Sequence, residues 1–268
     1  MARLLNLGCG ERHHPDWVNL DMKSANPDVL IADLRRGLPY SSGEFDVVYH
    51  SHVLEHLPRQ HARGLMDECY RVLRSSGILR VVIPDLESLA REYLDIIRMI
   101  DECDPRGHSR LEWIMLELFD QFVRTRPGGE MLEYLKRTDN PDEEYILSRT
   151  GSWALPLLKG LQGEYVENGH LITVSMTTRL RYLIRRVRNR FTDLKPGASD
   201  FTRSGERHLW MYDRHSLGRL LESSGFRDIS RLRHNQSHIP GWSDYMLDSD
   251  SNGLSANPGS LYLEALKP

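Results

Sequence analysis

The segment Leu4-Leu5-Asn6-Leu7-Gly8-Cys9-Gly10 opens the chain, and Trp17-Val18-Asn19-Leu20-Asp21 follows closely. An apolar run that ends in Gly-x-Gly predicts a strand and a tight turn, because glycine lets the backbone approach a ligand with no Cβ atom in the way. Asp21 ends the second run, where a carboxylate can accept the hydroxyls of a ribose. The pattern therefore predicts an α/β sheet with a nucleotide-like ligand at its edge.

Short β-rich runs alternate with turn or helix signals over residues 3 to 85, which is typical of a parallel sheet built from β-x-β units. The expected strands are 3–7, 18–21, 29–32, 45–50 and 77–83. A helix expected over 62–73 forms the crossover between the last two strands. The link from Gly10 to Val18 is too short for a first crossover helix, so we expect a departure there from an ordinary doubly wound sheet.

Amphipathic helix patterns with Pro and Gly breaks replace the strand rhythm after an expected helix at 86–100. They include helices at 111–123 and 130–136, and a run at 177–195 with seven Lys or Arg residues against Asp193 alone. The core pattern resumes with a helix at 216–223, a strand at 226–234 and a last strand at 260–266. We therefore expect an α/β sheet with a mostly helical insertion between its fifth and sixth strands, and parts at 1–100, 101–205 and 206–268.

Composition excludes several classes of protein. The net charge of −3 indicates no global basic field for nucleic acid, and three cysteines without C-x-x-C fit a reducing compartment. No signal-peptide pattern opens the chain and no apolar run reaches the roughly 18 residues of a membrane span, so we expect a cytoplasmic protein. The basic and apolar residues of 177–195 suggest peripheral contact with an anionic inner membrane or a phosphate-bearing acceptor. A solvated helix face is the alternative.

Several short motifs follow one another in order. They are LNLGCG at 5–10, Asp21, ADL at 32–34 with LPY at 38–40, FDVV at 45–48, VLEHL at 53–57 and RVLRSSG at 71–77, with a weaker echo at 210–226. This order resembles the class I S-adenosylmethionine-dependent methyltransferases, in their small-molecule branch, and implies a Rossmann-like sheet with S-adenosylmethionine as cofactor. LNLGCG together with WMYD at 210–213 resembles bacterial enzymes of surface-glycan or other secondary biosynthesis. That resemblance implies a sugar-like or lipid-linked glycan acceptor.

The resemblance also implies which residues contact the cofactor. They are Asn6, Gly8 and Gly10 at the turn, Asp21 at the ribose, Asp33 and Leu34 at the adenine, and His50 and Ser51 after the fourth strand. Asn6 stands where the family often has an acid, and Arg12 where a third glycine is usual. The methionine end would then depend on loop backbone and on side chains such as Arg12 or His13. The alternative interpretation is an ordinary turn with solvated strand-end carboxylates.

A histidine-rich segment at 50–56 follows the fourth strand at its carboxyl end, where open α/β sheets place ligands. A neutral histidine can remove a proton from an acceptor near neutral pH, and His52 is our first candidate for that base. His208 is the alternative base and Trp210 a candidate acceptor platform, and packing in the core or at an interface is the other interpretation of both residues. Asp85, after the fifth strand, is expected either to bind substrate hydroxyls or to cap the helix that follows.

His52, Glu55 and His56 have the spacing i, i+3 and i+4, so on a helix they can share a face and hold a metal. The stronger interpretation of Glu55 and His56 is a helix-start pair that packs against the sheet edge, and we expect no metal.

Two other functions stay open on the sequence. One is a regulatory or scaffold protein that binds S-adenosylmethionine without transferring its methyl group. The other is an NAD(P)-linked short-chain enzyme, although the sequence has no Tyr-x-x-x-Lys pair and the first motif lacks its third glycine. The acceptor, the methylated atom and the oligomeric state cannot be read from these residues.

Overall fold

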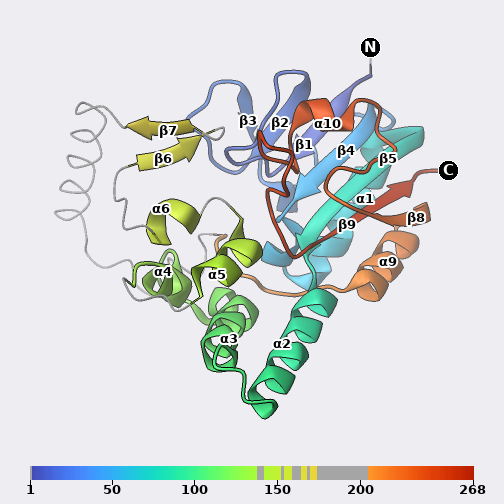
Figure 1. The fold of residues 1–268 in the computed structure, drawn as a ribbon. Coiled ribbons are helices and arrows are strands. Elements are labelled where there is room, and N and C mark those ends of the chain that lie inside the picture. Colours follow the sequence, from blue (N-terminus) through green and yellow to red (C-terminus); the bar gives the residue numbers. More distant parts are fainter. Residues whose placement is uncertain (1, 138–141, 152–153, 159–163, 168–169, 174–204) are drawn as a thin grey trace. The chain divides into compact units, whose positions relative to one another are not determined.

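The computed structural model describes residues 2–137, 142–151, 154–158, 164–167, 170–173 and 205–268 (Figure 1). The chain divides into two compact units, Met1–Ala90 with His208–Pro268, and Arg91–Arg207. The basic run expected at 177–195 lies outside the described residues.

The first unit holds a seven-stranded sheet in the order β3-β2-β1-β4-β5-β9-β8 (Figure 1). Its strands are β1 Leu4–Leu7, β2 Trp17–Asp21, β3 Val29–Ile31, β4 Phe45–Ser51, β5 Leu73–Pro84, β8 Arg227–Leu232 and β9 Ser260–Leu266. Strands β1 to β5 pair in parallel, and β9 runs antiparallel to β5 and β8. This is the Rossmann-like α/β sheet that the sequence predicts.

Helices α1 (Arg59–Val72) and α9 (Arg214–Ser223) cover one face of this sheet. Leu65, Met66, Cys69 and Val72 recur at the spacing of one helix face and are buried in the same cluster as the sheet's apolar side chains. Leu217 and Leu221 of α9 join this cluster, as the sequence predicts.

The opposite face carries an aromatic cluster that packs against the short helix α10 (Trp242–Tyr245). Trp17 and Tyr49 of the sheet meet Trp242 edge to face, with ring centroids 6.1 and 5.2 Å from that of Trp242. Aromatic rings favour such edge contacts over face-to-face stacking. This face is therefore closed by a loop with its aromatic side chains, which the strand and helix patterns of the sequence did not predict.

Two paired asparagines hold the short connection between β1 and β2, where the first crossover helix of a doubly wound sheet is missing. No helix joins β1 to β2, whose connecting residues 8–16 are all described. Asn6 and Asn19 are partners across these strands, and the Asn6 amide donates to Asn19 Oδ1 (3.1 Å) and to the Arg12 carbonyl (3.0 Å). The Asn19 amide donates to the His14 carbonyl at 2.9 Å. Buried amides thus satisfy the short loop's carbonyls, which water would otherwise have to do.

The second unit is mostly helical, as expected for the insertion between β5 and β8. It contains most of α2 (Leu86–Asp101), then α3 (Gly107–Val123), α4 (Gly129–Leu135), α5 (Glu143–Thr150), α6 (Leu155–Leu158) and an antiparallel pair, β6 (Glu164–Glu167) with β7 (His170–Thr173). The strand pair and the two helices before it were not predicted. Across the described residues, every helix is too short or too polar to cross a bilayer.

Candidate functional site at the carboxyl edge of the sheet

The candidate residues follow the carboxyl ends of the parallel strands. Gly8 follows β1, Asp21 ends β2, His52 follows β4 and Asp85 follows β5. Strand β1 lies between β2 and β4. The strands that follow β1 therefore extend the sheet first on one side, with β2 and β3, and then on the other, with β4 and β5. Such a switch point is where open α/β sheets bind ligands.

The glycine turn is tied to the end of β2. The amides of Gly8 and Cys9 donate to the Leu20 carbonyl (2.7 and 3.1 Å), and the Gly10 amide donates to Asp21 Oδ2 (2.8 Å). Asp21 Oδ1 accepts from the Lys23 amide at 3.1 Å. A carboxylate has about four lone-pair positions, so Asp21 keeps acceptor capacity for hydroxyl groups while its position is fixed.

The two glycines of this turn differ in what surrounds them. Both have positive φ, 63° for Gly8 and 52° for Gly10. A Cβ atom on Gly8 would overlap the Cγ2 methyl group of Val53, whereas one on Gly10 would meet no atom within 4 Å. Gly8 is therefore required by packing inside the protein, and Gly10 leaves open space in which a ligand can approach the backbone.

The methionine-end candidates make contacts within the protein. Asn6 is buried and holds the β1–β2 loop, so its side chain is occupied by Asn19 and Arg12. The Arg12 guanidinium donates to the Ser249 carbonyl at 3.4 Å. His13 Nε2 lies 2.7 Å from Nδ2 of the Asn26 side chain.

At the adenine side, Asp33 is bound by a neighbour, Arg35, that the motifs did not indicate. Its carboxylate accepts from the side chain of Arg35 at 2.8 and 2.9 Å and from the Arg35 amide at 3.1 Å. The hydrogen bond to the Arg35 side chain is the main reason that the pKa of Asp33 falls to about 2. Leu34 is buried in the core cluster rather than open at the edge.

His50 and Ser51 end β4 in different environments. His50 is fully buried, and burial lowers its pKa to about 4, although the charge of Glu55 acts in the opposite direction. Its imidazole is therefore neutral at physiological pH. Ser51 is half-buried, so of the two only Ser51 reaches the solvent-accessible edge.

His52 links a buried carboxylate to a hydroxyl group from the other end of the chain. Its Nδ1 lies 3.1 Å from Glu55 Oε1, and its Nε2 lies 3.0 Å from the Oγ of Ser260. His52 has a φ of 54°, a conformation that is uncommon outside glycine, while its amide continues the β4–β5 pairing by donating to the Val82 carbonyl at 2.9 Å. Non-glycine residues in this region concentrate at functional sites.

The helical face expected for His52, Glu55 and His56 does not form. Residues Leu54–His56 make only a 3-10 turn, η2, and His52 lies outside it in a left-handed conformation, so the three do not follow the spacing of an α-helix. His208, rather than His52, forms a compact group with Glu55 and His56. Nitrogen or oxygen atoms of Glu55, His56 and His208 lie within 4.8 Å of one another.

The buried carboxyl of Glu55 has three imidazoles as neighbours. Burial raises the pKa of this carboxyl, but the hydrogen bond from His52 and the neighbouring His52, His56 and His208 outweigh it and lower the pKa to about 2. Glu55 is therefore ionised.

The segment that carries His208 is fixed on Glu55. The amides of Leu209 and Trp210 donate to the Glu55 carbonyl at 2.7 and 3.2 Å, and the rings of His56 and His208 meet at 4.9 Å. Trp210 is partly exposed, with the Arg59 guanidinium 4.3 Å from its ring centroid. His208 itself is buried.

Asp85 has the geometry of the capping alternative. Its Oδ1 accepts from the Glu87 amide at 3.0 Å, at the start of α2, and its Oδ2 accepts from Arg231 at 2.8 Å. Asp85 is 1% exposed, so both oxygens are engaged inside the protein.

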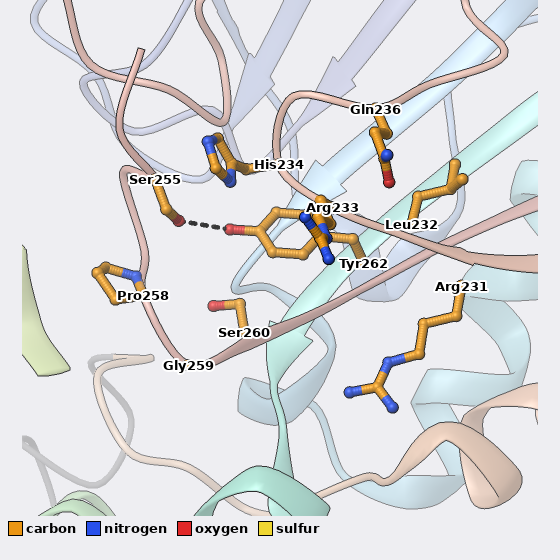
Figure 2. Close-up of a pocket in the computed structure, with 10 residues that line it drawn as sticks. All are labelled: Arg231, Leu232, Arg233, His234, Gln236, Ser255, Pro258, Gly259, Ser260 and Tyr262. Atoms are coloured by element: carbon orange, nitrogen blue, oxygen red, sulfur yellow. Dashed lines mark hydrogen bonds between the residues drawn. The ribbon is translucent and has the colours of Figure 1, made fainter. Parts of the chain in front are cut away.

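A pocket of about 460 Å³ lies at the same edge, between the end of β8 and the start of β9 (Figure 2). Its lining residues are Arg231, Leu232, Arg233, His234, Gln236, Ser255, Pro258, Gly259, Ser260 and Tyr262. Ser260, the partner of His52, is one of them. The sequence did not predict this pocket, because the strand patterns carry no signal for the pairing of β9 beside β5.

Residues 5–81 match the methyltransferase domain family. Strands β1 to β4, most of β5 and most of the ordered motifs lie in the matched part, so residues 5–81 form a methyltransferase domain, with S-adenosylmethionine as its cofactor. No curated protein sequence matches the chain.

Solved structures of similar proteins cover most of the chain at low identity. A SAM-dependent methyltransferase from Archaeoglobus fulgidus is 15% identical, over 99% of this chain and 86% of its own, with a TM-score of 0.39. An S-adenosylmethionine-dependent methyltransferase from Mesorhizobium loti is 14% identical, over 99% and 90%, with a TM-score of 0.40. A third, from Thermotoga maritima and described as a possible histamine N-methyltransferase, is 11% identical, over 100% and 83%, with a TM-score of 0.39.

Proposed function

We propose that this enzyme methylates a hydroxyl group of a small, sugar-like or lipid-linked glycan acceptor, with His52 as the general base. The observation that carries the proposal is the chain of contacts from Glu55 through His52 to Ser260, which ends in the pocket. In general-base catalysis, a carboxylate orients the imidazole on one side, and the imidazole faces a hydroxyl group on its other side. The contacts of His52 have this arrangement.

The residues that would hold the cofactor fit it. Gly10 offers open backbone beside the fixed carboxylate of Asp21, where ribose hydroxyls find an acceptor. Ser51 and the Asp33 region extend this edge on either side of β1. When bound there, S-adenosylmethionine supplies the electrophilic methyl group of its sulfonium centre.

Glu55 determines which nitrogen of His52 can accept a proton. Glu55 is ionised and its Oε1 lies 3.1 Å from Nδ1, which favours the proton on Nδ1 and leaves the lone pair of Nε2 toward Ser260. An acceptor hydroxyl that binds beside Ser260 would donate to the same Nε2. The base is thus oriented before the acceptor arrives, which lowers the cost of reaching a reactive geometry.

The other two catalytic candidates are assigned positioning roles. His208 contacts His56 and lies beside Glu55. Asp85 caps α2 and holds Arg231 at the pocket. Neither side chain is open to solvent.

The acceptor class and the cellular setting are part of the same proposal. The pocket is lined mainly by polar and basic side chains, which supports a hydroxyl-bearing acceptor over an apolar one. We place the enzyme in the cytoplasm, with residues 177–195 as a peripheral contact to the inner membrane when the acceptor is lipid-linked.

The test compares His52→Gln with His61→Gln, which changes an exposed histidine of α1. Both variants are incubated with S-adenosylmethionine and a panel of sugars, nucleotide sugars and lipid-linked glycans, and methylated products are measured by mass spectrometry. We expect His52→Gln to lose about 10²- to 10⁴-fold in kcat with unchanged binding of S-adenosylhomocysteine, and His61→Gln to match the wild type. Equal rates in both variants would remove His52 from the mechanism. Cofactor binding without turnover on any acceptor would favour the scaffold alternative.

A further inference from the structure

We infer that the pocket between β8 and β9 binds an acceptor that carries an oxyanion, a phosphate or carboxylate group, beside its hydroxyls. This inference rests on the proposed function and names the substrate class of the same site. It commits the pocket to an acidic sugar rather than to a neutral one.

The charge of the pocket points to an anion. Arg231, Arg233 and His234 line it, and none of its ten lining residues, all of them described, is acidic. Arg231 is already paired, with Asp85 at 2.8 Å and Glu87 at 3.9 Å. Arg233 is exposed, and within the described part of the chain no carboxylate lies at ion-pair distance from its guanidinium. It is the cation that a ligand can engage, and guanidinium groups match the geometry of phosphate and carboxylate.

The backbone that presents Arg233 is held from inside the sheet. Arg80 is fully buried on β5 and donates to three carbonyl groups of this wall, at 3.1 Å to Arg233, 3.3 Å to His234 and 2.9 Å to Gln236. Its own charge is matched by Asp248 at 2.8 Å and Glu264 at 2.7 Å. A wall fixed in this way loses little freedom when a ligand binds, and such pre-organisation favours affinity.

Hydroxyl groups line the side of the pocket toward β9. The Ser255 hydroxyl lies 2.9 Å from that of Tyr262 (Figure 2). The Tyr262 hydroxyl also donates to the Asn257 carbonyl at 3.1 Å. Ser260 on the same strand contacts His52 Nε2. An acceptor whose oxyanion binds Arg233 would therefore have hydroxyl partners at Ser255 and Ser260, and Ser260 is the one beside the proposed base.

The position of the pocket agrees with transfer between two neighbouring ligands. Strand β9 is two strands from β4, at whose end His52 lies, and β1 with its glycine turn is on the other side of β4. Neighbouring strands lie roughly 4.8 Å apart, and β4 stands between β1 and β9. An acceptor at β9 and a cofactor at β1 and β2 would therefore approach His52 from opposite sides. The pocket is thus on the acceptor side of the edge.

The experiment measures binding of defined probes by titration calorimetry. Glucose 6-phosphate, glucuronate, glucose and inorganic phosphate are titrated into the full chain and into Arg233→Gln, Arg233→Lys and Arg227→Gln. Arg227 lies at the other end of β8 and is the matched control. We expect glucose 6-phosphate or glucuronate to bind at least tenfold more tightly than glucose and than phosphate alone. Arg233→Gln should remove that preference, Arg233→Lys should restore part of it, and Arg227→Gln should retain it.

The outcomes separate this inference from the proposed function. The tighter of the two acidic sugars identifies the oxyanion as phosphate or carboxylate. Equal affinity for glucose and both acidic sugars, or an unchanged preference in Arg233→Gln, overturns the inference, whether or not S-adenosylhomocysteine binds. Tight binding of an acidic sugar in a protein that fails to bind S-adenosylhomocysteine supports the pocket and contradicts the proposed function.

Discussion

His52 Nδ1 lies 3.1 Å from Glu55 Oε1, although the two residues are not joined by an α-helix. The left-handed backbone of His52 turns its imidazole toward η2 on one side and toward Ser260 on the other. Glu55 is buried and ionised, so the relationship orients the ring and also fixes its tautomer. The reactivity proposed for His52 therefore depends on a residue that does not itself touch the acceptor.

Glu55→Gln should slow methyl transfer while leaving the cofactor in place. The amide preserves the volume of Glu55 but removes the charge that holds the Nδ1–H tautomer of His52. We expect kcat to fall by about 10²-fold, with little change in the KM for S-adenosylmethionine, and Glu55→Asp to recover part of the rate. Ring ¹⁵N shifts should show Nδ1–H in the wild type and a tautomer mixture in Glu55→Gln. A wild-type ring protonated on Nε2 would contradict this account.

The burial of His50 predicts acid sensitivity of folding. Its pKa falls from 6.5 to about 4 on folding, so below pH 6.5 the unfolded chain takes up a proton that the native state refuses. Stability from this group is complete above pH 6.5 and declines by roughly 3 kcal/mol as the pH falls to 4. Urea unfolding of His50→Leu should show a flatter pH dependence over this range than the wild type. The exposed control His61→Leu should keep the wild-type slope, and the same slope in His50→Leu would refute the prediction.

The two glycines of the first turn should separate stability from cofactor binding. Gly8→Ala forces a methyl group against Val53, and we expect a loss of about 1–3 kcal/mol in unfolding free energy. Gly10→Ala meets no neighbour, so its cost should be limited to about 1 kcal/mol of backbone strain. It should nevertheless weaken binding of S-adenosylhomocysteine by tenfold or more, because the methyl group occupies the open space. Tight binding by a stable Gly10→Ala protein would place the cofactor elsewhere.

Removal of metal ions should leave methyl transfer unchanged. In the proposed mechanism Glu55 binds the imidazole of His52, and a cation on Glu55 would compete with that contact. Activity after dialysis against EDTA is compared with activity after addition of Mg²⁺, Mn²⁺ or Zn²⁺. Loss on chelation with recovery by one of these ions would instead assign the Glu55, His56 and His208 cluster to a metal.

The sequence predicted the parts of this fold that are encoded locally. Apolar runs ended by Gly8 or Asp21 became strands, and the spacing of Leu65, Met66 and Cys69 became the buried face of α1. The proposed site depends on contacts that are distant in sequence. Ser260 reaches His52 only because β9 inserts beside β5, and His208 reaches Glu55 only after the whole insertion. Periodicity does not report strand order, so neither contact could be predicted.

S-adenosylmethionine is expected to bind at the glycine turn and Asp21, and the proposed function depends on that site. The most direct measurement is calorimetric titration of S-adenosylhomocysteine into the wild type and into Asp21→Asn, with Asp28→Asn as an exposed control from the loop before β3. We expect one site in the wild type and in the control. In Asp21→Asn we expect affinity to fall roughly 5- to 150-fold, because a carboxylate acceptor for buried hydroxyls is lost. No binding to the wild type, or equal binding to Asp21→Asn, would contradict the account.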